Sequence, residues 1–291
     1  MICQQLMQGE ISLNIEFSIE QAVKKRYSVR NYSEQSIEAE KVKAIKLFVD
    51  GLDNPFGKKV TFHFLDNEMK GQKKLGTYGV IKGAKRFIGA SITEEPMALE
   101  ALGYELETVM LYLAHLGLGT CWLGGTFNRI SFATAMEIEE GKLFPAITPY
   151  GYSAANMHRV ETMMRKVIKA DHRKPWDKLF FNRDFQTHLT KEEAGELEFP
   201  LEMLRLGPSA SNKQPWRILL KDGAWHFYEY KEPGYSDRFT YDIQRIDMGI
   251  AAAHFDLSAR EKGMKGHFDT ACKPELTLPV NMLYVYSWIR E

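Results

Sequence analysis

The stretch Gly207-Pro208-Ser209-Ala210-Ser211-Asn212-Lys213-Gln214-Pro215-Trp216 places turn-forming residues and short polar side chains between an expected helix and an expected strand. Gly207 and the two residues after it are typical of a helix end. Pro215 is expected to move Gln214 out of the helical region toward an extended conformation, so that a strand begins at Trp216. The serine, asparagine and glutamine side chains can both donate and accept hydrogen bonds, which suits a flat polar ligand. The alternative is an ordinary helix-to-strand connection, because Ser and Asn are common in turns.

A second polar motif, Arg26-Tyr27-Ser28-Val29-Arg30-Asn31-Tyr32, follows a short amphipathic helix for which Ser18 is the expected N-cap. Arg26 and Arg30 lie four residues apart around Ser28. Two guanidinium groups and a hydroxyl could therefore hold one anion through charge-assisted hydrogen bonds. The alternative is a solvated basic surface, since Lys24 and Lys25 precede the motif.

The long apolar pattern of the first half predicts a helix over residues 96–116, because leucines and a methionine recur at spacings of three and four residues. It runs into Gly117-Leu118-Gly119-Thr120-Cys121-Trp122-Leu123-Gly124-Gly125. Glycines there allow left-handed caps and close approach of the backbone to a ligand. Cys121 is predicted to be a small buried thiol beside Trp122, and His115, on the exit turn of the helix, is likewise predicted to be structural.

These three segments together resemble the FMN-dependent nitroreductase family. The stretch from Pro208 to Trp216 is similar to the family's flavin loop, and the stretch from Arg26 to Tyr32 to its phosphate signature. The glycine-rich exit is similar to the segment that approaches the flavin from the opposite side. The resemblance implies that FMN is bound by these residues: Arg26, Ser28, Arg30, Leu123, Gly124, Gly125, Pro208, Ser209, Ala210, Ser211, Asn212 and Gln214.

A basic stretch, residues 157–174, joins the two halves of the chain. Family members commonly place a phosphate-contacting basic residue just after the final strand. Arg165 is the candidate for that role here. A solvated helical linker would explain the same charges.

The second half repeats the order of parts of the first: basic entry, helix, turn, alternating strand, long helix, final strand. Residues 1–156 and 157–291 are therefore expected to be two nitroreductase-like halves. Each half lacks the family motifs that the other half retains. The loop 51–59 lacks the Ser/Asn/Gln array, Asp177 and Leu179 are aligned with Ser28 and Arg30, and the helix exit 264–269 lacks the double glycine.

This complementary loss is what a fusion of two protomers would produce, since the family forms dimers with each FMN at the interface. The resemblance implies an α+β fold of two mainly antiparallel sheets packed by helices, related by a pseudo-twofold with the two long helices between them. We expect a monomer that acts as a pseudo-dimer and holds one FMN. The counterpart site should be filled by side chains.

The resemblance implies hydride transfer from NADH or NADPH to FMN and then to a nitroaromatic, quinone or similar small-molecule acceptor. The cofactor supplies the chemistry, so no catalytic acid or base is assigned. The alternatives are a flavin-binding sensor or scaffold without turnover, and a flavin-destroying or dehalogenating member of the same superfamily.

Composition favours a protein of the cytoplasm. Lys and Arg total 38 and so do Asp and Glu, which gives no global argument for nucleic acid or an anionic membrane as partner. The three cysteines are widely spaced and contain no Cys-x-x-Cys pair, which argues against disulfides and a zinc site. No apolar run approaches membrane-spanning length, and Glu10 and Glu16 interrupt the start where a signal peptide would be apolar.

Overall fold

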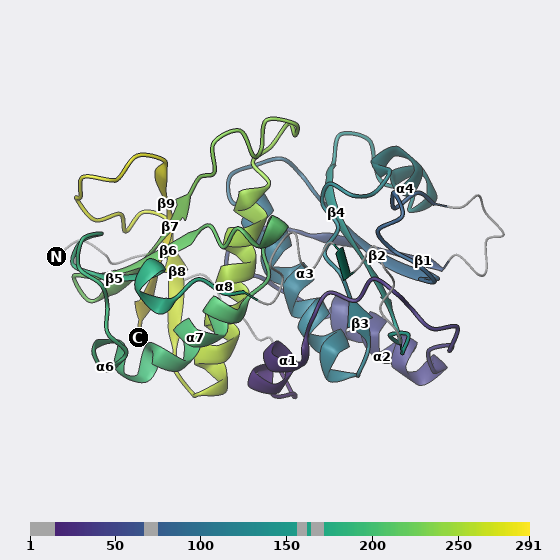
Figure 1. The fold of residues 1–291 in the computed structure, drawn as a ribbon, viewed down its shortest axis with the longest axis horizontal. Coiled ribbons are helices and arrows are strands. Elements are labelled where there is room, and N and C mark those ends of the chain that lie inside the picture. Colours follow the sequence, from purple (N-terminus) through teal and green to yellow (C-terminus); the bar gives the residue numbers. More distant parts are fainter. Residues whose placement is uncertain (1–14, 67–74, 156–161, 164–171) are drawn as a thin grey trace.

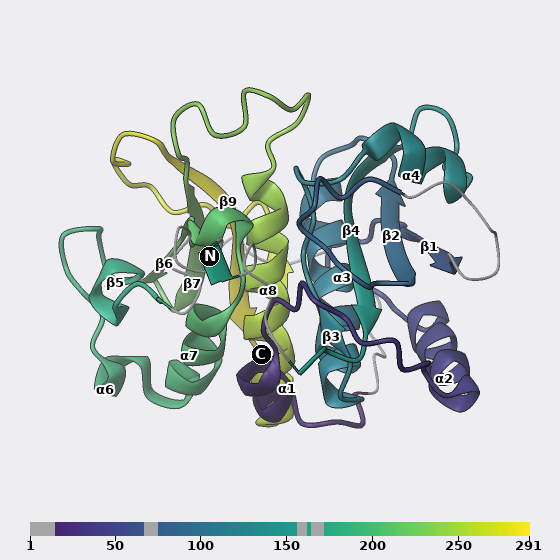
Figure 2. The ribbon, with the colours of Figure 1, turned by 45° about the vertical axis from the view of Figure 1, so that its right-hand side comes forward.

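The computed structural model describes residues 15–66, 75–155, 162–163 and 172–291. Two antiparallel-rich sheets flank a central pair of long helices, with one sheet on each side (Figures 1 and 2). The fold is therefore α+β with two halves, as the sequence predicts.

The first sheet has the strand order β1–β2–β4–β3, and every pairing in it is antiparallel. Its strands are β1 (Thr61–Asp66), β2 (Arg86–Ile92), β3 (Gly119–Thr120) and β4 (Leu143–Gly151). The helices of this half are α1 (Ile19–Lys25), α2 (Ala39–Asp50), α3 (Ala98–His115) and α4 (Arg129–Ala135). The Ser18 side chain accepts a hydrogen bond from the Gln21 amide and caps α1, as predicted.

Pro145 and Pro149 predict that the final strand of this half lies at a sheet edge, and this prediction is wrong. Strand β4 lies between β2 and β3. The prolines are accommodated because β3 has only two residues and pairs only with Tyr150 and Gly151. Most of that side of β4 therefore needs no continuous row of backbone donors.

The second sheet has the order β5–β6–β7–β9–β8, in which only the β5–β6 pairing is parallel. Its strands are β5 (Phe180–Asn182), β6 (Trp216–Lys221), β7 (Ala224–Tyr230), β8 (Gly266–Asp269) and β9 (Met282–Arg290). The α-helices are α6 (Lys191–Ala194), α7 (Glu198–Leu206) and α8 (Gln244–Glu261), with 3₁₀ turns η1 (Trp176–Lys178), η2 (Gly195–Leu197) and η3 (Ala210–Asn212). The pattern Thr190-Lys191-Glu192-Glu193 predicts a capping box, and the structure has this capping box at the start of α6.

The hairpin from β6 to β7 turns at Asp222 and Gly223, which both have positive φ, 51° and 79°. An Asp-Gly pair between two apolar runs predicts a hairpin turn, and the structure confirms this turn.

The two long helices, α3 and α8, cross at equivalent glycines. A Cβ on Gly103 would lie 2.2 Å from the Ile246 carbonyl oxygen, and a Cβ on Gly249 would lie 2.1 Å from the Glu100 carbonyl oxygen. Only glycine permits this approach of the two backbones. The helices therefore pack closely at the pseudo-twofold axis, where the sequence repeat places them.

The structure contradicts one part of the alignment between the two halves. The stretch 174–181 was aligned with 25–32, yet the two occupy opposite edges of their sheets. Ser28 bridges Thr120 of β3, whereas β5 pairs with β6, the equivalent of β1. The edge of β6 offers a row of unpaired backbone groups, and β5 adds to it as a parallel strand.

Candidate flavin site

The first basic motif lies against the glycine-rich exit of α3. Arg26 is the C-cap of α1, and the Val29 amide donates to the Thr120 carbonyl oxygen at 2.8 Å. A Cβ on Gly119 would lie 2.5 Å from the Val29 side chain, so this glycine lets the motif approach. The fold thus brings together two of the three segments that the sequence singled out.

Arg26 and Arg30 carry buried cationic groups with unused donors. Arg30 is only 5% exposed, and its Nη1 donates a long hydrogen bond of 3.5 Å to the Ser28 carbonyl oxygen. Among the described residues, Nε and Nη1 of Arg26 and Nε of Arg30 have no hydrogen-bond partner. Buried donors of this kind normally have partners. The orphaned guanidinium atoms therefore fit a phosphate group, which accepts several charge-assisted hydrogen bonds.

A carboxylate that sequence reasoning missed lies between the motifs. Glu107 of α3 has a fully buried side chain, and its Oε2 accepts a hydrogen bond of 2.6 Å from Trp122 Nε1. Its Oε1 lies 3.6 Å from Arg26 Nε and 2.9 Å from Nε2 of His254 on α8. The available signal was the presence of three glutamates, Glu100, Glu105 and Glu107, among the apolar residues of the predicted helix, since acidic residues are rarely buried without partners.

The segment Leu123 to Gly125 lies at the interface of the halves. Leu123 and Ile147 exchange backbone hydrogen bonds of 3.0 Å in both directions, which fixes the segment to β4. A Cβ on Gly124 would lie 2.9 Å from Ile243, and one on Gly125 would lie 3.4 Å from Phe239. The two glycines therefore bring the backbone of the first half close to side chains of the second.

The Ser/Asn loop follows α7, which has Gly207 as its C-cap, and it contains Pro208, the turn η3 and Gln214. Ser211, Asn212 and Gln214 have positive φ angles of 48°, 55° and 48°. Gln214 thus leaves the helical region as predicted, but its backbone is left-handed rather than extended. Asparagine tolerates this region better than most residues.

The polar groups of this loop bond to the protein in the described structure. Ser209 Oγ accepts from the Gln214 amide at 2.8 Å, and Ser211 Oγ accepts from the Tyr235 hydroxyl at 2.8 Å. The Ala210 amide donates to Asp247 Oδ1 at 2.9 Å. These bonds give the loop one fixed shape.

Asn212 and Gln214 bond to the segment 172–174. Asn212 Nδ2 donates to the His172 carbonyl oxygen at 2.9 Å, and Arg173 Nη1 donates to Asn212 Oδ1 at 3.3 Å. The Lys174 amide donates to Gln214 Oε1 at 2.7 Å. Burial, with Arg217 nearby, lowers the pKa of Lys174 to about 8. Arg165 lies outside the described residues, and Arg173 and Lys174 are residues of the basic stretch 157–174 that the structure describes against the loop.

A buried carboxyl group supports the loop from α8. Asp247 is 2% exposed, and within the described structure its Oδ2 has no hydrogen-bond partner. Burial raises the pKa of Asp247 well above its usual range, although the Ala210 amide opposes this effect. Sequence reasoning did not identify Asp247.

Residues 231–243, between β7 and α8, connect the Ser/Asn loop to the glycine segment. Tyr235 contacts Ser211, and Phe239 lies beside Gly125. Arg129 Nη2 donates to the Tyr241 hydroxyl at 3.0 Å and to the Gly124 carbonyl oxygen at 2.8 Å. Sequence reasoning missed this segment as well. The available signal was its three aromatic residues, which the short β2–α3 connection, residues 93–97, does not have.

The counterpart of the Ser/Asn loop, residues 51–59, packs as a core element. The Phe56 ring lies 5.6 Å from Phe268, 5.4 Å from Tyr286 and 6.4 Å from Tyr104, measured between ring centroids. Asn54 Nδ2 donates to Glu105 Oε1 at 2.5 Å. This region is filled by side chains of both halves, as the sequence predicts.

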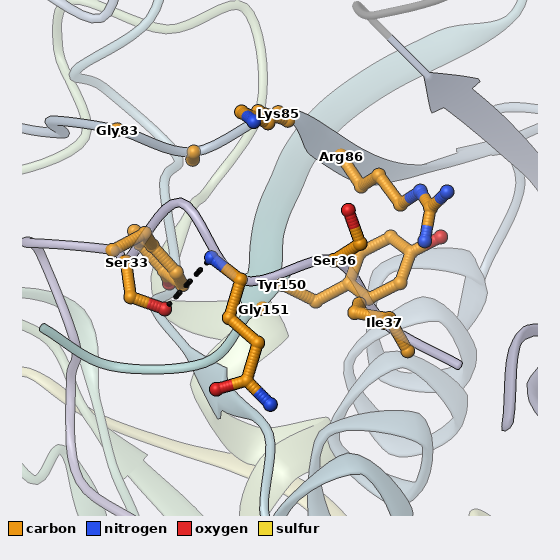
Figure 3. Close-up of a pocket in the computed structure, with 11 residues that line it drawn as sticks. Ser33, Ser36, Ile37, Gly83, Lys85, Arg86, Tyr150 and Gly151 are labelled. Carbon is orange, nitrogen blue, oxygen red and sulfur yellow. Dashed lines mark hydrogen bonds between the residues drawn. The ribbon is translucent and has the colours of Figure 1, made fainter.

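A small open pocket of about 20 Å³ lies elsewhere in the first half (Figure 3). Its walls include Ser33, Ser36, Gly83 and Tyr150, and none of the candidate flavin-binding residues lines it. Its cations are paired, Lys85 with Glu34 at 2.9 Å and Arg86 with Asp66 at 2.8 Å. It is therefore a weaker anion site than the Arg26 motif.

The described residues contain no helix with the length and apolar character needed to cross a membrane. They also contain no cluster of three or more histidine, cysteine or acidic side chains arranged to bind a metal ion.

The chain is similar to known nitroreductases. A family model described as "Putative TM nitroreductase" matches residues 18–259. The crystal structure of a "putative nitroreductase" from Thermotoga maritima MSB8 aligns over 99% of this chain and 99% of its own, with a TM-score of 0.59 and 20% identity. No curated protein matches the chain.

Shorter nitroreductases align with about half of the chain. One with bound FMN from Desulfitobacterium hafniense DCB-2 covers 48% of this chain and 90% of its own, at 17% identity and a TM-score of 0.40. Another with bound FMN from Bacteroides fragilis NCTC 9343 covers 50% and 93%, at 18% identity and a TM-score of 0.39. With the family model matched over residues 18–259, the chain belongs to the nitroreductase family and contains two nitroreductase-like halves.

Proposed function

We propose that this chain is an FMN-dependent oxidoreductase that uses NADH or NADPH to reduce a nitroaromatic, quinone or similar small-molecule acceptor. The observation that carries the proposal is the pair of buried arginines, Arg26 and Arg30, whose guanidinium groups have orphaned donors beside the glycine-rich segment. Their chemistry suits the phosphate of FMN. The family match supports the same cofactor.

The candidate binding residues come from both halves of the chain. Arg26, Ser28 and Arg30 would hold the phosphate, and Leu123 to Gly125 would present backbone to one side of the ring system. The Ser/Asn loop, Pro208 to Gln214, would present its fixed backbone from the second half. Arg165 keeps its proposed phosphate role, and Arg173, which bonds to Asn212, is a second basic residue for it.

FMN would supply the hydride chemistry, accepting two electrons from a nicotinamide and passing them to the acceptor. The protein's own contribution is to orient the ring system, exclude water and fix the phosphate. We assign no catalytic acid or base.

The same contacts favour a monomer acting as a pseudo-dimer with one FMN. The surviving site draws on both halves of one chain, so no second chain is needed to complete it. The filling of the counterpart by Phe56, Phe268 and Tyr286 supports a single site. The few cysteines, of which Cys121 is buried, support a reducing cytoplasm as its location.

The test is anaerobic reduction. Protein loaded with FMN is mixed with NADH or NADPH, the bleaching of the flavin absorbance is followed, and a panel of nitroaromatic and quinone acceptors is then added. We expect one nicotinamide to bleach the flavin and an acceptor to restore its colour. A yellow protein bleached by neither nicotinamide would instead support a flavin-binding sensor or scaffold. Analysis of products would identify flavin destruction or dehalogenation.

A further inference from the structure

Glu107 contacts the phosphate motif, the glycine-rich exit of α3 and helix α8 of the second half. Its carboxylate meets Arg26 of the phosphate motif, Trp122 beside the glycine segment and His254 of the second half. His254 in turn lies under the start of the Ser/Asn loop, since a Cβ on Gly207 would lie 3.5 Å from its ring.

The hydrogen bonds of His254 fix its orientation. Nδ1 lies 2.9 Å from the Met203 carbonyl oxygen, which can only accept, so Nδ1 carries a proton. Nε2 lies 2.9 Å from Glu107 Oε1, and a hydrogen bond there requires a proton between those two atoms. Glu107 is thereby bound to α8 and, through His254, to α7.

Arg26 depends on this carboxylate in the described structure. Its side chain is 5% exposed, Glu107 Oε1 lies 3.6 Å from its Nε, and Nε and Nη1 have no hydrogen-bond partner among the described residues. A buried cation without a nearby opposite charge is costly. Glu107 therefore sets where the Arg26 guanidinium group rests before a phosphate arrives.

We propose that Glu107 is a positioning residue of the FMN site, which holds Arg26 in the direction that the FMN phosphate requires and ties it to the second half through His254. The proposal rests on the proposed function, because it assumes that Arg26 binds the phosphate. It adds a specific consequence: Glu107 should affect affinity for FMN and not for riboflavin, which has the same ring system without the phosphate.

The experiment compares FMN and riboflavin binding to the apo-protein by fluorescence titration for wild type, Glu107→Gln and a matched control, Glu105→Gln. Glu105 lies on the same helix and faces the filled counterpart through Asn54. We expect Glu107→Gln to weaken FMN binding about tenfold or more, as loss of a hydrogen-bonded charge does, and to change riboflavin binding little. The control should change neither affinity.

The outcomes separate the two claims. If wild type binds neither ligand, the proposed function fails. If wild type binds FMN and Glu107→Gln has an unchanged or higher ratio of FMN to riboflavin affinity, the positioning role is overturned, since a merely structural residue would affect both ligands alike. If circular dichroism shows that Glu107→Gln is unfolded, Glu107→Asp is tested instead. This variant retracts the carboxylate by one methylene and must show the same loss of FMN preference.

Discussion

The candidate site and its counterpart across the pseudo-twofold use the same loop position in opposite ways. In the second half the loop 207–215 is a polar turn held by Asp247 and the segment 172–174. In the first half the loop 51–59 carries Phe56, which packs on Phe268 and Tyr286. An unliganded hollow would forfeit packing energy, and the aromatic side chains at the counterpart position avoid that loss.

The difference extends to buried charge. On the candidate side, guanidinium atoms of Arg26 and Arg30 are left without partners among the described residues. On the counterpart side, the buried Asp256 is paired with Tyr104 at 2.7 Å and with Arg260 at 2.9 Å. Buried donors without partners are the reason that we propose an anion site on the candidate side and not on the counterpart side.

The largest effect is expected from Arg30→Glu. The substitution removes a phosphate donor and places a carboxylate in its position, which should weaken FMN binding by about 100-fold or more in this buried setting. The matched control is Lys178→Glu, a reversal of the same sign at an exposed residue of the second half. Retention of FMN by a folded Arg30→Glu protein through gel filtration, with unchanged affinity, would show that the phosphate lies elsewhere.

The second effect concerns pH on the counterpart side. Burial raises the pKa of Glu105 to about 8, against hydrogen bonding from Asn54, which lowers it. A raised folded pKa stabilises the protein below the unfolded value of 4.5 and loses that contribution as pH rises through about 8. One pKa unit corresponds to about 1.4 kcal/mol, so Glu105→Gln should exceed wild type in unfolding free energy by a few kcal/mol near pH 9.

The measurement is urea unfolding of both proteins at pH 5 and pH 9. The two should be similar at pH 5, since glutamine resembles the protonated acid and can still accept from Asn54. An equal loss of stability in both proteins between these pH values would show that Glu105 does not cause the pH dependence.

A smaller loss is expected from Phe56→Ala. The side chain is only partly buried, so removal of its ring should lower the unfolding free energy by about 2 to 3 kcal/mol. FMN content should remain at one per chain, because the cavity lacks phosphate ligands. Tyr78→Ala, at a ring that is 69% exposed, is the control and should change stability little. Binding of a second FMN by Phe56→Ala would mean that the counterpart can still bind FMN and that the Phe56 ring only blocks it.

The smallest effect is expected from Asn212→Leu. Asn212 bonds to His172 and Arg173, so leucine should loosen that segment and remove a polar group from the loop. FMN binding should weaken by about 1 to 2 kcal/mol, which calorimetry can resolve. An unchanged affinity would identify the loop as an ordinary connection between α7 and β6.

Local chemistry explains what the sequence could predict. The Ser18 cap, the capping box at Thr190 and the Asp222-Gly223 turn each depend on residues within a few positions. Gly103 and Gly249 hold equivalent positions in the two copies of the sequence repeat, because the close crossing of α3 and α8 at the pseudo-twofold axis requires glycine in both helices.

The features that the sequence could not predict depend on contacts between residues far apart in the chain. Glu107 resembles a surface charge in sequence, since its partners lie 15, 81 and 147 positions away. Strand β5 was misplaced because pairing at a sheet edge is decided by which edge is open. The left-handed Gln214 was missed because Pro215 restricts its neighbour without fixing the sign of φ.

The most direct test of the account is the amount of flavin released per chain on denaturation, measured together with the mass of the native protein by light scattering. The account predicts one FMN in a particle of one chain, because the surviving site is complete within the chain and its counterpart is filled. Two FMN per monomer would contradict the asymmetry of the halves. One FMN found only in dimers would contradict the assembly of the site within a single chain.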